Sequence, residues 1–296
     1  MPALSPKPTR FLGPANAPFN VLVVAEGFTG LTMPEFHNAC DNRIAPAVRG
    51  EAWYKKGNVA SAVAFWKCAL KSGKSGQKLT FPGACPAGVT YANAIPSVSF
   101  QTEFGSDGCE TVRPKSSLVQ AWAAALSEAW QGVPAFNMHL VLVRFPAPAG
   151  LTQGTVAAAT VTAGVANWAL HELGHCFGLD DEYEPDPGVA DQPAGGGASW
   201  DGINNICGYT QFTSDLRTPW GETLLSAPLK VNCTAIVLAS GGVGVYEGAN
   251  NFHCLSFRPA PTCRMRLRHH RFCPICRDVI ANTLDPTSVS DPTYVA

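Results

Sequence analysis

The stretch His171-Glu-Leu-Gly-His-Cys-Phe-Gly-Leu-Asp-Asp-Glu-Tyr183 contains the most informative pattern in the chain. On a helix, residues i and i+4 lie on one face, one turn apart, so His171 and His175 can direct two imidazoles at one metal ion. Glu172 stands next to the first histidine and can reach a water at that ion without binding the ion itself. The pattern H-E-x-x-H therefore predicts a helix that carries a metal site.

The residues after the second histidine predict a third ligand. Gly178 can take the left-handed conformation that ends a helix sharply and turns the chain back. Three acidic residues follow, Asp180-Asp-Glu182. The spacing favours Asp181, and in an extended segment its two neighbours project to the opposite side, although the longer stem of Glu182 keeps that residue as an alternative. We therefore expect the two histidines and Asp181 to bind Zn²⁺, with a fourth position left for water.

Strands and helices alternate ahead of this motif, which is typical of an α/β layer. At the first helix, Thr32 is the expected N-cap, with Pro34 in the first turn and Glu35 at a capping-box spacing. We expect strands over residues 20–25, 59–70, 137–145 and 155–162, and helices over 32–48, 116–130 and 163–177.

The chain changes character after the motif. Residues 184–221 are rich in Pro, Gly, Asp and Asn and predict a long loop. A helix over 273–284 is the clearest later element. We expect a single catalytic domain over residues 1–296.

Several stretches resemble the IgA-peptidase family of zinc metallopeptidases, in the metzincin clan. Residues 171–183 resemble the active-site stretch of that family, with Asp-Glu-Tyr at 181–183 as the most specific part. Asn20-Val-Leu-Val-Val-Ala-Glu-Gly-Phe-Thr29 resembles its first strand and turn. Cys263-Arg-Met-Arg266 and Phe272-Cys-Pro-Ile-Cys276 resemble its C-terminal region.

This resemblance implies an α/β (α+β) metzincin-like fold. Its parts would be a mixed, mostly parallel sheet with two long helices, the second carrying the ligands, and a mostly irregular lower half with a C-terminal helix. The upper part would cover about residues 15–180 and the lower part about 181–296, with the active-site cleft between them. It also implies that Met265 packs in a tight turn beneath the zinc.

The implied activity is a zinc-dependent endopeptidase that acts on a protein or peptide. Zinc would lower the pKa of a bound water towards ~7, and Glu172 would take its proton during attack on a peptide carbonyl. Tyr183, Tyr209 and Tyr246 are candidates for a phenol that donates to the oxyanion.

Two other classes of function remain open. One is a non-catalytic binding protein on the same fold that binds a partner or a glycan with the loop at 184–221, although such a protein does not need Glu172. The other is a thiol oxidoreductase that uses Cys273 and Cys276.

Composition excludes two classes of partner. The net charge is −1, whereas a sequence-independent nucleic-acid binder needs a marked basic excess, so we expect no nucleic-acid partner. Apolar runs such as 137–145 and 234–245 are too short or too interrupted by glycine for the ~20 residues of a membrane span.

The cysteine count bears on location. The first 18 residues lack the apolar core of a secretory signal, so the chain is either intracellular or a mature form whose signal was removed. Eleven cysteines favour the second, and we expect a secreted, periplasmic or extracellular protein with disulfides. Eleven is an odd number, and Cys176 is the candidate for a free thiol.

The cysteines near the C-terminus allow three interpretations. Cys273 and Cys276 could join His269 and His270 in a second zinc site, form a redox pair, or form disulfides with cysteines elsewhere. A structural zinc site usually draws its ligands from two spaced pairs, and a redox C-x-x-C normally opens a helix in a thioredoxin-like βαβ unit. We therefore expect disulfides.

Overall fold

The computed structural model of the protein describes residues 6–72, 100–104, 111–145, 148–183, 205–208, 238–240 and 243–286. The chain divides into two compact units. Unit 1 comprises Met1–Gly50 and Asn58–Cys176, and unit 2 comprises Glu51–Gly57 and Phe177–Ala296. The division after Cys176 falls near the change of character predicted at about residue 180. The single catalytic domain stays a prediction.

Unit 1 is built on a six-stranded sheet with the strand order β1-β3-β2-β6-β8-β7. Its strands are β1 (Thr9–Leu12), β2 (Phe19–Glu26), β3 (Val63–Cys68), β6 (Met138–Val143), β7 (Gly150–Gln153) and β8 (Val156–Thr160). The four inner strands run parallel, and β1 and β7 are antiparallel to their neighbours at the two edges. The predicted mixed, mostly parallel α/β sheet is confirmed, while the metzincin fold itself stays a prediction.

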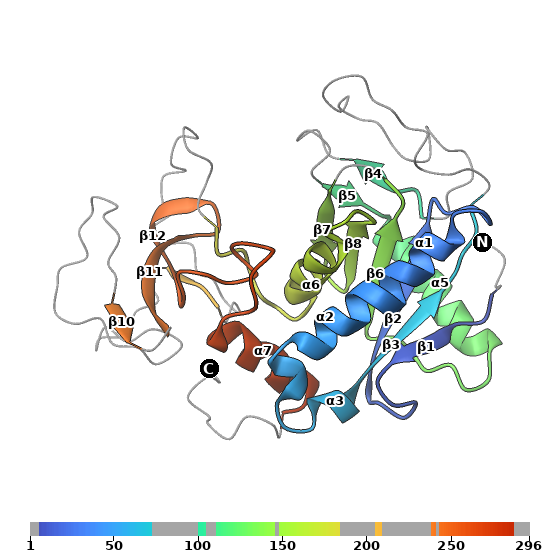
Figure 1. Ribbon diagram of the computed structural model, residues 1–296, viewed down its shortest axis with the longest axis horizontal. Helices are drawn as coiled ribbons and strands as arrows, with labels where there is room; N and C mark the ends of the chain where they lie inside the picture. The colour runs from blue at the N-terminus through green and yellow to red at the C-terminus, as the bar shows by residue number, and fades with distance from the viewer. Residues whose placement is uncertain are drawn as a thin grey trace. The chain divides into compact units, whose positions relative to one another are not determined.

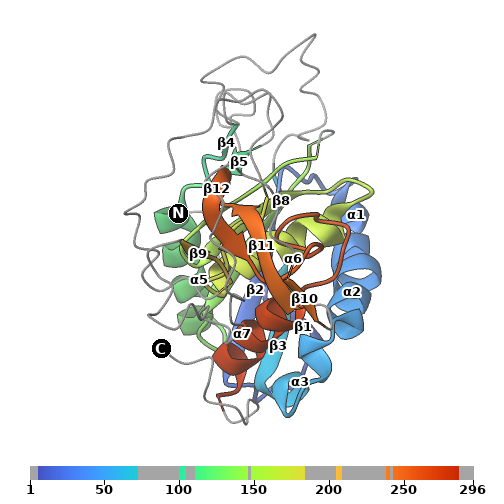
Figure 2. The ribbon, with the colours of Figure 1, turned by 90° about the vertical axis from the view of Figure 1, so that its left-hand side faces the viewer.

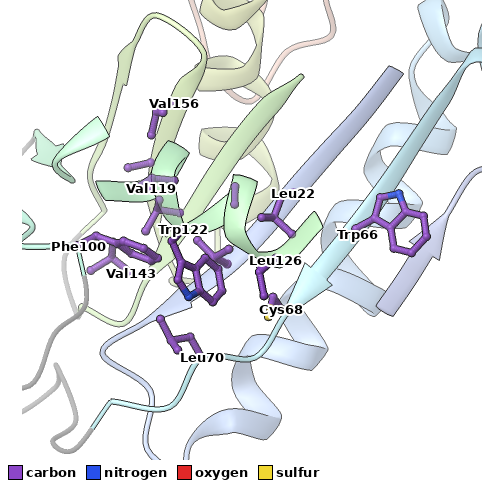
Figure 3. Packing of buried hydrophobic residues seen from close by; sticks show 14 of the residues in the cluster. Leu22, Trp66, Cys68, Leu70, Phe100, Val119, Trp122, Leu126, Val143 and Val156 are labelled. Atoms are coloured by element: carbon purple, nitrogen blue, oxygen red, sulfur yellow. The ribbon is translucent and has the colours of Figure 1, made fainter. Parts of the chain in front are cut away.

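Helices cover both faces of this sheet, which is why its central strands read as continuous apolar runs. Helix α5 (Ser116–Ala129) lies on one face, and α1 (Met33–Asn38), α2 (Ala45–Gly50) and α6 (Val165–Cys176) lie on the other (Figure 1). Side chains alternate between the faces, so Leu22 and Val24 of β2 join the core under α5. Trp122 of α5 meets Phe100 edge to face there, with ring centroids 5.6 Å apart (Figure 3).

Two details of unit 1 differ from expectation. Thr32 is the N-cap of α1, but its side chain makes no capping bond and instead accepts from the Thr29 N–H. Glu35 does not complete a capping box, because its carboxylate pairs with the Arg144 guanidinium at 2.8 Å. From α1 the chain continues into α2 through a π-helical segment, η1 (Ala39–Ile44).

The predicted strand at 59–70 begins later than expected. Its first four residues form the short helix α3 (Val59–Ala62), because the Asn58 carbonyl accepts from the N–H groups of Ser61 and Ala62 and closes one turn. The other predicted strands and helices of this unit are confirmed to within a few residues at each end.

Unit 2 contains an antiparallel sheet that the sequence analysis did not predict. The strand order is β10-β11-β12-β9, and β11 and β12 form a twisted ribbon (Figure 2). Its strands are β9 (Cys207–Gly208), β10 (Leu238–Ser240), β11 (Val243–Ala249) and β12 (Phe252–Arg258). The turn between β11 and β12 is Asn250-Asn251, with φ of 49° and 63°, the left-handed pair that a two-residue hairpin favours.

The predicted C-terminal helix is confirmed as α7 (Pro274–Leu284). A short segment from earlier in the chain, around η2 (Trp53–Lys55), belongs to the same unit and is tied to it by two ion pairs. These are Lys56 to Asp278 at 2.8 Å and Glu51 to Arg264 at 2.7 Å. The predicted loop at 184–221 lies outside the described residues except at 205–208. Among the described helices, none has the length and apolar character that crossing a bilayer requires.

Candidate metal centre

Helix α6 places the two histidines and the glutamate of the motif as the sequence predicts. The rings of His171 and His175 lie one turn apart, with centroids separated by 4.9 Å and planes at 86°. His171 and Glu172 are buried. The helix ends at Cys176, and Gly178 has a φ of +84° with open space at its Cβ position. Backbone conformation, and not crowding, therefore requires glycine there.

Residues 180–183 form an extended segment held along its backbone. The Glu182 N–H donates to the Met265 carbonyl at 2.9 Å, and the Asn250 N–H donates to the Asp181 carbonyl at 2.9 Å. Asn205 clamps Asp180: its Nδ2 donates to the Asp180 carbonyl at 2.9 Å and its Oδ1 accepts from the Asp180 N–H at 2.8 Å. These bonds fix the register of the three acidic residues.

Neighbouring acidic residues in this segment join different clusters. Two groups of described side chains could hold a metal ion, and in each group one ligand atom per residue lies within 4.8 Å of the others. The first, which we call the histidine group, is His171, His175 and Asp181. The second, which we call the cysteine group, is Glu182, Cys263, Cys273 and Cys276. The alternation expected of an extended chain accounts for this split between residues 181 and 182.

Strand β7 packs against Glu172 and restricts its side chain. The hydroxyl Oγ1 of Thr152 lies 3.0 Å from Glu172 Oε2 and 2.7 Å from the Glu172 carbonyl oxygen. A Cβ on Gly150 would lie 2.5 Å from Glu172 Oε1 and 2.8 Å from a ring carbon of Trp168. Gly150 therefore leaves the space that the carboxylate occupies, and Thr152 orients it. No local motif in the sequence marks either residue, so neither Gly150 nor Thr152 is predicted from it.

The cysteine group lies within unit 2 and is buried throughout. The Sγ atoms of Cys263 and Cys276 are 3.6 Å apart. Glu182 Oε1 lies 3.0 Å from the Sγ of Cys276 and 3.9 Å from that of Cys273. Asn205 Nδ2 donates to the same carboxylate oxygen at 3.1 Å. Carboxylate and thiols thus face a common centre.

Burial dominates the ionisation of this group. It raises the pKa of Glu182 and of Cys276 well above their ordinary values, and it raises the pKa of Cys263 to about 12. Burial also opposes ionisation of Cys273, but hydrogen bonds with Cys263 and Cys276 outweigh it and lower the pKa of that thiol to about 6. Without a cation, the site therefore keeps most of its ligands protonated.

The expected disulfides of Cys273 and Cys276 are absent from the structure. Both are free thiols, as are Cys40, Cys68, Cys176 and Cys263. The reason is spatial: the neighbour of Cys276 is Cys263 at 3.6 Å, beyond the ~2.05 Å of an S–S bond, and all three thiols converge on a carboxylate. The free state predicted for Cys176 agrees with the structure. The side chains of the other five cysteines lie outside the described part.

Met265 and two of the three candidate tyrosines lie in the described part of the chain. Met265 is fully buried in the turn that Leu267 closes by donating its N–H to the Cys263 carbonyl at 2.7 Å. The tight turn is present, and its position beneath a zinc ion stays a prediction. Tyr183 is half-buried and Tyr246 is buried, while Tyr209 lies outside the described residues.

No protein-family model matches this chain, and no curated protein matches it.

Proposed function

We propose that this protein is a zinc-dependent endopeptidase. The observation that carries the proposal is the convergence of His171, His175 and Asp181, whose ligand atoms lie within 4.8 Å of one another. Two imidazoles and one carboxylate are a donor set of catalytic zinc sites, which keep one position open for water or substrate. When bound, zinc supplies a Lewis acid that polarises a peptide carbonyl and makes water acidic enough to react near neutral pH.

Glu172 has the placement expected of the general base. It follows a ligand directly in the sequence, and Thr152 and Gly150 fix its carboxylate. It would take a proton from the attacking water as the new C–O bond forms, then deliver that proton to the amine nitrogen as the C–N bond breaks. Because the rotamers of this carboxylate are already restricted, it loses little conformational entropy when it takes up the proton.

The two other classes of function find less support. A pure binding protein gains nothing from a buried, oriented Glu172 beside the ligands. A thiol oxidoreductase must present its reactive sulfur to a partner, but Cys273 and Cys276 are 4% and 0% exposed.

A diverse peptide library incubated with the full chain tests the proposal. We expect cleavage of internal peptide bonds that stops on treatment with a chelator and returns on addition of Zn²⁺. Binding of peptides without cleavage, in protein that contains zinc, would contradict the proposal and favour the binding protein.

A further inference from the structure

We propose that the cysteine group, Glu182 with Cys263, Cys273 and Cys276, is a second metal site that binds a structural Zn²⁺ ion. This site lies within unit 2, and its ligands are separate from those of the histidine group. Three soft sulfur ligands and one carboxylate oxygen suit zinc in the closed four-coordinate arrangement of structural sites.

The distances between the ligand atoms fit a tetrahedral ion. Two sulfurs at ~2.3 Å from a tetrahedral centre lie about 3.8 Å apart, and the Sγ atoms of Cys263 and Cys276 are 3.6 Å apart. A sulfur and a carboxylate oxygen in such a site lie about 3.6 Å apart. The two measured values, 3.0 Å to Cys276 and 3.9 Å to Cys273, fall on either side of it.

The carboxylate provides an independent sign of a missing ligand. Glu182 is fully buried, and its Oε2 has no hydrogen-bond partner among the described residues. A buried carboxylate oxygen without a partner is costly, and buried charges in proteins are normally paired or bound to metal. A divalent cation at the centre of the group would compensate both this oxygen and the ionised thiols.

The backbone around the site is arranged to support thiolates. The Cys273 N–H donates to the Sγ of Cys263 at 3.3 Å, and the Cys276 N–H donates to the Sγ of Cys273 at 3.5 Å. Cys273 is the N-cap of α7, where the helix dipole favours negative charge. Pro274 in the first turn provides the fixed φ that begins this helix. The sulfurs are therefore oriented before any ion binds.

A disulfide explains these residues less well than a metal does. Three cysteines can form only one disulfide among themselves, which would leave the third thiol buried beside a carboxylate whose Oε2 has no hydrogen-bond partner among the described residues. The metal uses all four groups. It also accounts for the position of a carboxylate 94 residues away from Cys276 in the sequence.

One consequence rests on the proposed function. Asp181 and Glu182 are adjacent in an extended segment, so their side chains project to opposite sides. An ion that holds Glu182 to the start of α7 also holds the backbone that presents Asp181. The second site would then act as a positioning device for the third ligand of the first.

Metal stoichiometry tests the proposal, with full-length protein purified without chelator and analysed by mass spectrometry of the elements. We expect two zinc ions per chain in the unmutated protein. The double variant His171→Ala/His175→Ala should keep one zinc ion per chain, held by the cysteine group. Cys273→Ser should lose one of the two ions and keep the one at the histidine group. Cys68→Ser is the matched control, because Cys68 is a buried thiol outside both groups, and it should keep two.

Cobalt separates the two sites without relying on the folding of a cysteine variant. Co²⁺ exchanged into His171→Ala/His175→Ala should give the thiolate-to-cobalt charge-transfer absorption in the near ultraviolet. A double variant that holds no metal would overturn the second site and leave the endopeptidase untouched. One bound ion with this absorption in the double variant, together with no cleavage by the unmutated zinc-loaded protein, would support the second site and contradict the proposed endopeptidase.

Alkylation without reductant distinguishes metal from disulfide. The protein is unfolded with a chelator present, alkylated and digested, and its peptides are weighed. We expect Cys263, Cys273 and Cys276 all to be alkylated. If two of the three are modified only after reduction, they were joined in a disulfide and the proposed site is wrong.

Discussion

The histidine group and the cysteine group show how differently two candidate metal sites can be encoded. Two ligands of the histidine group lie one helical turn apart on α6, and the third follows a glycine that turns the chain. The cysteine group instead joins a residue beside that turn to three cysteines from the end of the chain. The histidine group is a local sequence pattern with three candidate ligands, which leaves a fourth position for water or substrate. The cysteine group has four candidate ligands that come from distant parts of the sequence.

The largest effect is expected at Glu172, the proposed general base beside the histidine group. Glu172→Gln keeps a side chain of the same shape but cannot accept the proton from water. We expect peptidase activity to fall by about 10²–10⁴-fold, with zinc content and melting temperature unchanged. Activity and zinc are measured on one preparation.

Glu128→Gln is the matched control for that experiment, since Glu128 is exposed on α5. A Glu172→Gln protein with most of its activity would remove Glu172 from the mechanism.

The next effect concerns the split between adjacent acidic residues. Asp181→Ala removes a ligand of the histidine group, whereas Asp180→Ala removes a carboxylate that accepts from the Asp181 N–H. We expect Asp181→Ala to weaken zinc binding by more than ~10²-fold, since even groups that only orient a ligand cost 10–100-fold. Asp180→Ala should change it far less.

Affinity is measured by competition with a chelator in proteins whose cysteine group is intact, and the zinc held by that group is subtracted with His171→Ala/His175→Ala measured in parallel. Equal affinities for Asp181→Ala and its parent would move the third ligand to a neighbour.

Glu26 sharpens the comparison because it is a buried carboxyl group whose oxygens have protein partners. Glu26 Oε1 accepts from the Phe100 N–H at 3.0 Å and Oε2 accepts from the Thr102 hydroxyl. Burial raises its pKa from 4.5 to about 7 against these hydrogen bonds. The folded state thus keeps a proton that the unfolded state releases between those pH values, and stability falls as pH rises through this window.

We expect this group to remove about 3 kcal/mol of unfolding free energy between pH 4.5 and pH 7. In Glu26→Gln the loss should be absent. Denaturant unfolding at several pH values measures the difference between the two proteins, which cancels the titration of other groups. A difference that does not vary with pH would show that Glu26 ionises normally.

Features that depend on local sequence patterns could be predicted, whereas features that depend on tertiary folding could not. The parallel sheet and α6 follow from local apolar runs and from i, i+4 spacing, and both are confirmed in coarse form. The hairpin of β11 and β12 was missed, although Asn250-Asn251 is a turn signal. A second zinc site at His269, His270, Cys273 and Cys276 is not expected from the sequence, because these residues do not form two spaced pairs, whereas the structure brings Cys263 and Glu182 to Cys273 and Cys276. Pairing over 94 residues depends on tertiary folding, which no local pattern encodes.

A smaller effect is expected at Gly150, which gives the base its space. Gly150→Ala places a methyl group 2.5 Å from Glu172 Oε1, and the end of that side chain must move. Displacing a reacting group by about 1 Å can cost ~10²-fold in rate. We expect kcat to fall by up to that factor with zinc retained. Gly132→Ala, at an open position with a φ of +81°, should lower stability and leave kcat unchanged.

The smallest effect is expected at Thr152, whose hydroxyl contacts Glu172 Oε2 at 3.0 Å and the Glu172 carbonyl at 2.7 Å. Thr152→Val keeps the shape of the side chain and removes the donor. Because a hydrogen bond to a charged group contributes about 1.5–3 kcal/mol, partial compensation by water leaves an expected loss of about tenfold in kcat. Thr152→Ser restores the donor and should recover most of the rate, which a purely structural role would not predict.

Thr155→Val is the control, since the Thr155 hydroxyl accepts from Gln120 at 3.1 Å on the exposed surface. If Thr152→Val keeps the full rate while Thr152→Ser loses it, the methyl group and not the hydroxyl is what Glu172 needs. The base would then owe its position to the space at Gly150 alone.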